Sequence, residues 1–308
     1  MTAAPVLPSV APQAMGSQSA DHVCNVCDPA GVPIGNAKTA TVRPNIRRLQ
    51  NERFHVWRCP RCHSIHAEED VDLDFYYRDY PFLAMPMDWR VRAMYKNQLS
   101  RLKAAGLERD ARILDYGCGA GNFVKYLRSC GYTKATGYDA YSSEFGDRSV
   151  LERRYECIIS QDVIEHVAAP WELLQTFHEL AANDGIVAIG TPDAAAIDLE
   201  RTDDFIHPLH QPFHRHILST RALLEAGHKL GWRLFRYYPT MYANTLVPFI
   251  NSRFVFHFMK CGDDTIDVVF GPIDLKNAKL WTLPTLYYGL FGYFHAPKTD
   301  VMAVFHAR

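Results

Sequence analysis

Three glycines that follow a short apolar run form the segment of this sequence with the clearest chemistry. The run Ile113–Tyr116 has the length and composition of a buried strand, and glycines stand after it at positions 117, 119 and 121. Glycine adopts positive φ and lacks a Cβ, so its backbone can approach a bound molecule closely. The helix expected next would present unpaired N–H groups, which favour a negatively charged group. The segment therefore predicts a ligand-binding turn between a strand and a helix.

Two carboxylates flank this turn. Asp115 stands two positions before the first glycine, and Asp139 ends the next expected strand, about 20 residues further on. In doubly wound folds, a carboxylate at that second position can accept hydrogen bonds from ribose hydroxyls. A dinucleotide fingerprint would have its third glycine where Asn122 stands, so an NAD-linked enzyme is disfavoured. The pattern indicates a nucleoside-bearing ligand at the carboxyl ends of the strands.

Four cysteines form two Cys-x-x-Cys pairs near the N-terminus, Cys24 with Cys27 and Cys59 with Cys62. Two residues between thiols let both sulfurs turn toward one ion at about 2.3 Å, and two such pairs complete a tetrahedral zinc site. Four thiolates leave no position for a catalytic water, so the predicted role of the zinc is structural. Arginines at positions 43, 47, 48, 53 and 58 would offset the negative charge. The alternatives are unrelated reduced thiols or a redox pair.

The elements that must position these groups alternate between strands and helices. Apolar residues at 3.6-residue spacing predict a helix at 88–105, in which Gln98 is the polar member of the apolar stripe. Further expected helices are 122–129, 170–182 and 218–230, and the expected strands are 113–116, 135–138, 157–160, 186–189, 232–238 and 301–306. This alternation predicts an α/β fold with a doubly wound, mostly parallel sheet that is covered by helices on both faces.

The bulk composition fits one large globular domain and a small one. The chain has 308 residues, 48% hydrophobic and 22% charged, so it can bury a sizeable core. Its net charge of −1 gives no global positive field for nucleic acid or an anionic membrane. No apolar run reaches the ~20 residues that span a bilayer, and we expect no membrane partner. Eight cysteines without a secretory signal favour a reduced, cytoplasmic protein.

Changes of composition along the chain predict its domain organisation. Residues 1–20, rich in Ala, Pro, Ser and Gln, read as a disordered tail, and residues 21–75 hold the four-cysteine module. Residues 76–308 form the α/β domain, within which residues 241–298 are an aromatic-rich insertion. The insertion is too long for a simple loop. Three roles remain open for it: a roof over an apolar acceptor, additional core, or a homodimer face.

With these features in place, the sequence resembles the class I S-adenosylmethionine-dependent methyltransferases. Their first motif is an acid followed by x-Gly-x-Gly-x-Gly, which matches Asp115–Gly121. Further blocks match in order at Gly137–Asp139, Tyr155–Val167, Asn183–Pro192 and His214–Ser219. The run Asp-Val-Ile-Glu-His-Val at 162–167 is most similar to the branch that includes the ubiquinone-pathway O-methyltransferases. The resemblance covers residues 90–240 and implies a Rossmann-like, seven-stranded-type sheet that binds S-adenosylmethionine.

The resemblance also implies roles for individual residues. Asp115, Gly117, Gly119 and Gly121 would line the methionine part of the cofactor, Asp139 would hold the ribose hydroxyls, and Gln161, Asp162 and Val163 would lie beside the cofactor. One departure is visible, because segment 140–154 is short where relatives have a helix and a strand. The adenine contacts are therefore not assigned, beyond Tyr141 as a candidate for stacking.

Histidines are the candidate general bases if the acceptor is a hydroxyl. Methyl transfer is an in-line displacement in which the protein mainly aligns the acceptor and excludes water. Removal of a hydroxyl proton needs a base, and histidine is the usual one. The candidates are His166, His207, His210, His214 and His216, and the resemblance implies that His166, His214 and His216 lie on the carboxyl-end rim. The alternative role for each is structural packing, and the spacing of carboxylates and histidines does not by itself indicate a second metal.

The sequence therefore predicts transfer of a methyl group from S-adenosylmethionine to a small-molecule acceptor in a biosynthetic or secondary-metabolite pathway, with O-methylation favoured over C- or N-methylation. The cysteine module resembles the zinc ribbons of some secondary-metabolite and sugar methyltransferases, and of certain ribosomal RNA methyltransferases. A zinc-ribbon RNA methyltransferase is thus one alternative, although the charge balance disfavours nucleic acid as a partner. The second alternative is a non-catalytic scaffold of the same fold.

Overall fold

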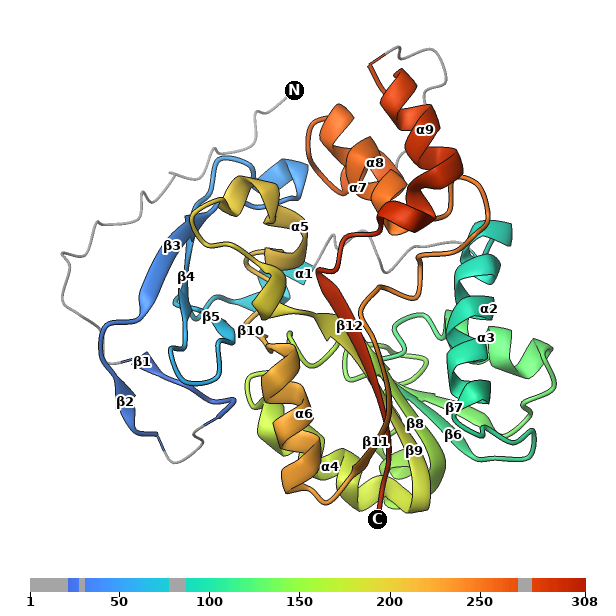
Figure 1. Cartoon of the computed structure of the whole chain (residues 1–308). Coiled ribbons are helices and arrows are strands. Elements are labelled where there is room, and N and C mark those ends of the chain that lie inside the picture. The colour runs from blue at the N-terminus through green and yellow to red at the C-terminus, as the bar shows by residue number, and fades with distance from the viewer. Residues whose placement is uncertain (1–21, 28–30, 78–86, 271–278) are drawn as a thin grey trace, which may run out of the picture.

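A mostly parallel, six-stranded sheet forms the centre of the protein, whose computed structural model describes residues 22–27, 31–77, 87–270 and 279–308 (Figure 1). The strand order is β11-β12-β9-β8-β6-β7. The parallel strands are β6 (Ile113–Tyr116), β7 (Ala135–Tyr138), β8 (Tyr155–Gln161) and β9 (Ala181–Pro192), and β12 (Asp300–His306) runs antiparallel to both β9 and β11 (Arg233–Tyr238). The predicted α/β fold class is confirmed, and the tail predicted at 1–20 lies outside the described residues.

Helices cover both faces of this sheet, as Figure 1 shows. They are α4 (Pro170–Leu180) and α6 (Thr220–Lys229) on one face and α2 (Trp89–Ala104) and α3 (Asn122–Ser129) on the other. Successive strand residues point to opposite faces, so Ile113 packs with α2 and α3 while its neighbour Leu114 packs with α4 and α6. Both side chains are fully buried. The two-residue alternation thus builds two hydrophobic cores around one sheet.

The segment between β7 and β8 is short, as the sequence indicated. Residues 140–154 contain the 3-10 helix η3 (Arg148–Glu152) and no strand, so β7 forms the edge of the sheet. For this reason the seven-stranded-type sheet has six strands in the described part of the chain. Strand β9 extends beyond the predicted 186–189 in both directions, and α4 therefore ends at Leu180. The Asn-Asp-Gly sequence at 183–185 lies within this strand.

The four-cysteine module is built on a sheet that it shares with the α/β domain. Strands β3 (Lys38–Val42), β4 (Phe54–Arg58) and β5 (Ile65–Ala67) pair antiparallel, and β10 (His216–Ile217) of the α/β domain pairs with β5. A hairpin of β1 (His22–Val23) and β2 (Pro33–Ile34) lies beside this sheet. The helix η1 (Arg47–Leu49) belongs to the module, and we also count with it α1 (Leu73–Tyr77), which continues two residues past the predicted boundary at 75.

Polar and apolar contacts reinforce the shared sheet. The Arg58 guanidinium donates to the carbonyls of Ala194 and Ile197 at 2.9 and 2.6 Å. The Ser219 hydroxyl donates to the Cys62 carbonyl at 2.5 Å. One buried apolar cluster contains residues of β3, β4, β5 and β10 together. The module and the α/β domain are therefore joined by a common core and by hydrogen bonds.

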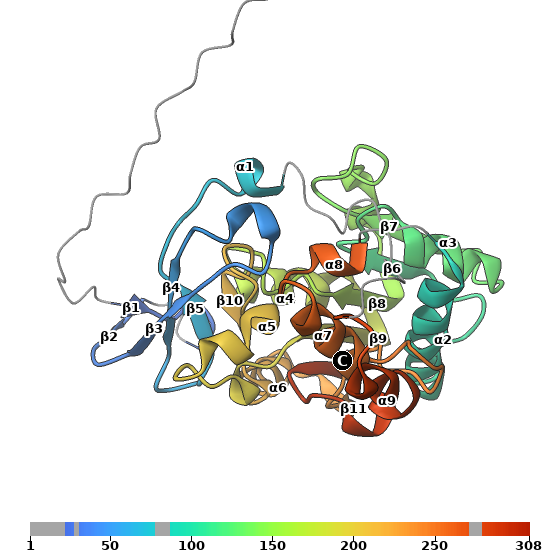
Figure 2. The same cartoon turned by 90° about the horizontal axis from the view of Figure 1, so that it is seen from above.

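The C-terminal segment is largely helical and lies at the carboxyl edge of the sheet. It contains α7 (Ser252–Cys261), α8 (Asp267–Phe270), α9 (Leu283–Phe291) and η6 (Gly292–His295). The short helices η4 (Ala194–Ala196), η5 (Thr202–Asp204) and α5 (Ile206–Leu209) lie between β9 and β10 in the chain. Figure 2, which looks down on this edge, shows α1, α5, α7 and α8 around it. Within the described residues, no helix is both long enough and apolar enough to cross a bilayer.

Candidate active site and metal centre

The turn after β6 has a backbone that only glycine adopts readily. Gly117, Gly119 and Gly121 have positive φ angles of 78°, 53° and 69°. A Cβ on Gly117 would lie 2.2 Å from the Val163 side chain, and one on Gly121 would lie 2.2 Å from the Phe145 ring. A Cβ on Gly119 would meet no atom within 4 Å. Gly119 therefore presents bare backbone to open space, which suits a ligand that lies against the turn.

The Asp139 carboxylate is held beside this turn by backbone N–H groups. Gly119 donates to its Oδ2 at 2.8 Å, and Tyr141 donates to its Oδ1 at 2.9 Å. Each carboxylate oxygen has a further lone pair, which can accept a hydrogen bond from a hydroxyl group. The ring of Tyr141, the residue predicted to stack on adenine, is 72% exposed and stacks on Tyr77 with ring centroids 5.8 Å apart. Because Tyr77 belongs to α1, the cysteine module reaches this side of the turn.

A cavity of ≈ 90 Å³ adjoins the turn. It is lined by Tyr95, Gln98, Asp115, Gly117, Cys118, Phe123, Gln161, Asp162 and Tyr242. The structure thus brings together four of the predicted cofactor residues. Tyr95, Gln98 and Tyr242 come from α2 and from the C-terminal segment, and sequence reasoning did not assign them to the site. The polar Gln98 in an otherwise apolar helical stripe was the one signal that could have indicated this role.

A buried and a half-buried carboxyl group make this cavity suited to a positively charged ligand. Burial, together with the nearby Asp139 carboxylate, raises the pKa of Asp115 to about 7. Burial raises the pKa of Asp162 to about 6, although the Gln161 amide donates to its Oδ1 at 2.7 Å. A bound cation would favour the ionised form of both groups and lower their pKa values. The electrostatics of the cavity therefore disfavour an anionic ligand group and favour a cationic one.

A cluster of buried histidines lies near the carboxyl end of β8. The His166 Nδ1 lies 3.1 Å from the Phe213 carbonyl and 2.8 Å from the Tyr77 hydroxyl. Since a carbonyl only accepts, Nδ1 carries the proton and Nε2 keeps the lone pair. The His214 ring lies 4.8 Å from that of His166, and its Nδ1 donates to the Pro208 carbonyl at 2.8 Å. Burial lowers the pKa of His166 to about 4, so this ring is neutral at pH 7 and can accept a proton.

Glu165 adds a buried carboxyl group to this cluster. Its Oε2 accepts a hydrogen bond from the Thr191 hydroxyl at 3.0 Å, and its Oε1 has no hydrogen-bond partner among the described residues. That oxygen lies 4.0 Å from His214 Nε2. Ligand atoms of Glu165, His166 and His214 lie within 4.8 Å of one another, so this donor set could hold a small cation. Sequence reasoning did not select Glu165, although it stands inside a matched block.

His216 has different surroundings from the other two predicted catalytic histidines. Its Nε2 donates to a backbone carbonyl at 3.1 Å, and its Nδ1 lies 2.9 Å from His66 Nδ1. His66 Nε2 in turn lies 3.2 Å from Cys24 Sγ. The ring of His216 therefore contributes to the surroundings of the cysteines, and the structure does not bring it together with His166.

His207 and His210 are joined through one side chain of the module. The Asn45 amide lies 3.2 Å from His207 Nδ1 and 2.6 Å from His210 Nδ1. His207 Nε2 lies 3.4 Å from Asp264, in the connection between α7 and α8. These contacts place His207 between the module and the connection from α7 to α8, and they place His210 against the module.

The four cysteines come together at one point. Cys24 Sγ lies 3.6 Å from Cys62 Sγ, and Cys27 Sγ lies 3.8 Å from Cys59 Sγ. All four sulfurs lie within 4.8 Å of one another, and all four residues are free of disulfide bonds. A tetrahedron with metal–sulfur bonds of about 2.3 Å has edges of about 3.8 Å. The observed spacing of the sulfurs therefore fits one metal ion that four thiolates coordinate in a tetrahedron.

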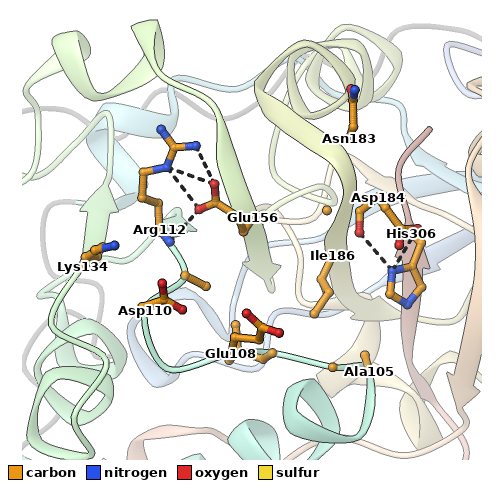
Figure 3. Close-up of a pocket in the computed structure, with 14 residues that line it drawn as sticks. Ala105, Glu108, Asp110, Arg112, Lys134, Glu156, Asn183, Asp184, Ile186 and His306 are labelled. Carbon is orange, nitrogen blue, oxygen red and sulfur yellow. Dashed lines mark hydrogen bonds and ion pairs between the residues drawn. The ribbon is translucent and has the colours of Figure 1, made fainter.

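A wider hollow of ≈ 690 Å³ lies at the opposite, amino edge of the sheet (Figure 3). Two ion pairs lie among its charged groups, Arg112 with Glu156 at 2.5 Å and His306 with Asp184 at 3.6 Å. Ligands of open α/β sheets bind at the carboxyl ends of the strands, so the chain direction argues against a catalytic role here. The smaller cavity is therefore the candidate active site.

Comparisons with known proteins concern the α/β domain. Residues 89–236 match the sequence family described as "Methyltransferase domain", a range that contains all the predicted cofactor residues. No curated protein sequence matches the chain. One similar solved structure is an S-adenosylmethionine-dependent methyltransferase from Archaeoglobus fulgidus, with 16% identity, a TM-score of 0.42, and coverage of 76% of this chain and 100% of that one.

Two further solved structures have similar values. An S-adenosylmethionine-dependent methyltransferase from Mesorhizobium loti has 13% identity and a TM-score of 0.40, with coverage of 68% of this chain and 97% of that one. Coclaurine N-methyltransferase, bound to N-methylheliamine and S-adenosylhomocysteine, has 16% identity and a TM-score of 0.42, with coverage of 69% of this chain and 71% of that one.

The buried Asp115 carboxyl predicts a pH dependence of stability. Its pKa is about 7 in the folded protein and about 3.9 in an unfolded chain, so the folded state binds the proton more tightly. The contribution of Asp115 to the free energy of unfolding therefore falls as the pH rises between these values. Asp115→Asn should gain stability relative to the unaltered protein between about pH 5 and pH 8, by at most about 3 kcal/mol. Urea unfolding at both pH values measures this change, and a difference that does not vary with pH would contradict it.

Proposed function

We propose that this chain, whose residues 89–236 match a methyltransferase family, transfers a methyl group from S-adenosylmethionine to an oxygen atom of a small-molecule acceptor. The cofactor supplies a methyl group on a sulfonium, which is already activated for displacement. The residues of the chain then have three tasks, which are to bind the cofactor, to align the acceptor and to accept its proton. We infer a biosynthetic or secondary-metabolite pathway as the setting.

The observation that best supports this function is the glycine turn after β6, whose backbone is open to a ligand and which lies between the carboxyl groups of Asp115 and Asp139. Gly119 leaves its backbone open to a ligand, and the Asp139 carboxylate beside it can accept hydrogen bonds from ribose hydroxyls. In the adjoining cavity, the ionised forms of Asp115 and Asp162 would stabilise a sulfonium. A nucleoside that carries a positive charge needs both features together. A non-catalytic scaffold would have no need to retain them.

The neutral histidines support methylation at oxygen. His166 and His214 each donate through Nδ1 to a backbone carbonyl, so each keeps a lone pair on Nε2 with which to accept a hydroxyl proton. Burial raises the pKa of the nearby Glu165 carboxyl, and its ionised form would stabilise the imidazolium that forms. Tyr77 contacts His166 and would orient its ring. We do not extend the catalytic proposal to His216, because its ring lies with His66 beside the cysteines.

We also propose that Cys24, Cys27, Cys59 and Cys62 bind a structural zinc ion. The support is the sulfur spacing described above and the donor set, since four thiolates close the coordination shell. The zinc would fix the two Cys-x-x-Cys turns against each other. Because β5 of the module pairs with β10, the ion would also stabilise the join to the α/β domain.

The arginines of the module weigh against the RNA methyltransferase alternative. Arg43 pairs with Asp264 and with Asp203, and Arg47 pairs with Asp263. The guanidinium of Arg58 is directed to backbone carbonyls of the α/β domain. Charges that are already engaged inside the protein provide little attraction for phosphates. The basic residues between the cysteine pairs thus act mainly in holding the chain together.

Substitution in the glycine turn tests the cofactor site. Gly119→Ala should keep the protein folded, at a cost of about 1–2 kcal/mol for the left-handed backbone, because its Cβ would meet open space. The affinity for S-adenosylmethionine, measured by titration calorimetry, should fall at least about tenfold because the methyl group occupies the cofactor's place. Gly106→Ala is the matched control, since Gly106 also has positive φ and open surroundings but lies outside the site. Equal affinities for the two variants would refute the site.

Substitution of the histidines tests the base. His166→Ala and His214→Ala should lower turnover by about 10²–10⁴ and leave the affinity for S-adenosylmethionine unchanged. Turnover is measured as release of S-adenosylhomocysteine with a panel of phenolic and sugar acceptors. The unaltered enzyme should lose kcat as the pH falls through about 4, where His166 becomes protonated. The exposed His228→Ala serves as control, and wild-type turnover in both test variants would rule out histidine base catalysis.

Metal analysis tests the zinc proposal. Mass spectrometry of the purified protein should find one zinc ion per chain, and Cys62→Ser should lose it. Because the module shares a sheet with the α/β domain, the loss should lower the thermal midpoint of the whole chain. Cys130→Ser, outside the cluster, should retain both the zinc and the midpoint. Protein that holds no zinc, or a Cys62→Ser variant as stable as the parent, would contradict the proposal.

A further inference from the structure

One face at the carboxyl edge of the sheet exposes a group of large apolar side chains. The group comprises Leu246, Val247, Phe249, Leu283, Leu286, Tyr287, Leu290, Phe291, Tyr293 and Phe294, and we call it the apolar apex. Leu283 is 83% exposed, Phe294 71% and Leu246 69%. Exposed apolar residues are normal when scattered, but a contiguous group of this kind marks an interaction surface.

The fold holds the residues of the apolar apex together in one surface. On α9, Thr285 and Gly289 are buried, whereas Leu283, Leu286 and Leu290 recur at helical spacing on an exposed side. The loop at 246–249 is fixed beside this helix, because the Phe249 N–H donates to the Gly289 carbonyl at 2.7 Å. Figure 1 shows α9 as the outermost helix at this edge of the molecule. Because the side of α9 with Thr285 and Gly289 packs against the protein, the side with the leucines faces solvent.

The charged residues that directly border the segments of the apolar apex are all positively charged. Neither residues 241–252 nor residues 280–297 contain Asp, Glu, Lys or Arg. Three of the four residues that border these two segments are basic, namely Arg253, Lys279 and Lys298, and the fourth is the uncharged Thr240; both lysines are exposed. The acidic residues of the α7–α8 connection are paired with arginines of the module. An apolar surface with a basic border is complementary to a surface in which an apolar layer lies beneath a layer of anionic groups.

We propose that the apolar apex docks this protein onto an anionic membrane surface. The leucine and phenylalanine side chains would enter the boundary of the acyl chains, and Lys279 and Lys298 would lie among the headgroups. Tyr287 and Tyr293 suit this boundary, because each has an apolar ring and a polar tip. A symmetric contact with a second copy would instead bring two basic borders together, which repel.

The proposal revises the expectation of no membrane partner, which rested on net charge and on the lack of a spanning segment. A net charge near zero says nothing of a local surface, and a docked helix does not need to span the bilayer. The inference is independent of the methyl acceptor and of the cofactor.

Vesicle binding by the full chain tests this proposal. The unaltered protein should co-sediment with vesicles of phosphatidylcholine and phosphatidylglycerol more strongly than with phosphatidylcholine alone. The double variant Leu283→Glu/Leu290→Glu should bind roughly a hundredfold more weakly, because two inserting side chains become charged. Leu234→Glu is the matched control, since Leu234 is 43% exposed on β11, outside the apolar apex, and should not change the binding. Near-ultraviolet circular dichroism establishes that each variant is folded.

Three outcomes would overturn the membrane assignment. The first is an unaltered protein that binds neither kind of vesicle. The second is a dimer by light scattering that the double variant converts to a monomer, since the apolar apex would then be the face of a second copy. The third is an equal loss of vesicle binding in Leu234→Glu and in the double variant, which would show that the effect is not specific to this face.

Discussion

The hydrogen bond from the Gly119 N–H to the Asp139 carboxylate is the contact on which the arrangement of the active site depends. Strands β6 and β7 are parallel neighbours, with Tyr116 paired to Tyr138, so their chains leave the sheet side by side. The bond then fixes the left-handed turn after one strand against the acid after the other. The same sheet edge places the carboxyl group of Asp115 and the residues after β8 around the adjoining cavity. A ligand that bridges the turn and the cavity thus meets groups whose positions are set by backbone pairing.

The cysteine module takes part in the active site as well as in the stability of the chain. Tyr77, on the last turn of α1, contacts both Tyr141 beside the turn and His166 in the histidine cluster. On its other side, His66 links the cysteines to the ring of His216 on β10. Two side chains of the module therefore touch the α/β domain at the groups proposed for chemistry and at the join between the two parts.

Local pattern was sufficient to predict the parallel sheet, the glycine turn, the position of Asp139 beside it and the cysteine cluster, because each is marked by short motifs or apolar runs that can be recognised within single segments. The contributions of Tyr95, Gln98 and Tyr242 depend on how α2 and the C-terminal segment pack over the cavity, and no short-range spacing encodes that packing. The separate surroundings of His214 and His216 were not predictable for a similar reason. The chain before β10 is irregular, so no periodicity indicates which way each ring faces.

The pairing of β5 with β10 has a consequence for the evolution of this protein. A strand of two residues completes the module's sheet, and its apolar side chains belong to the module's own core. Neither part could be exchanged for a relative's version as an independent cassette, since each would leave the other with an open sheet edge and uncovered apolar surface. A substitution on one side of the join would therefore be accepted only where the other side still packs against it.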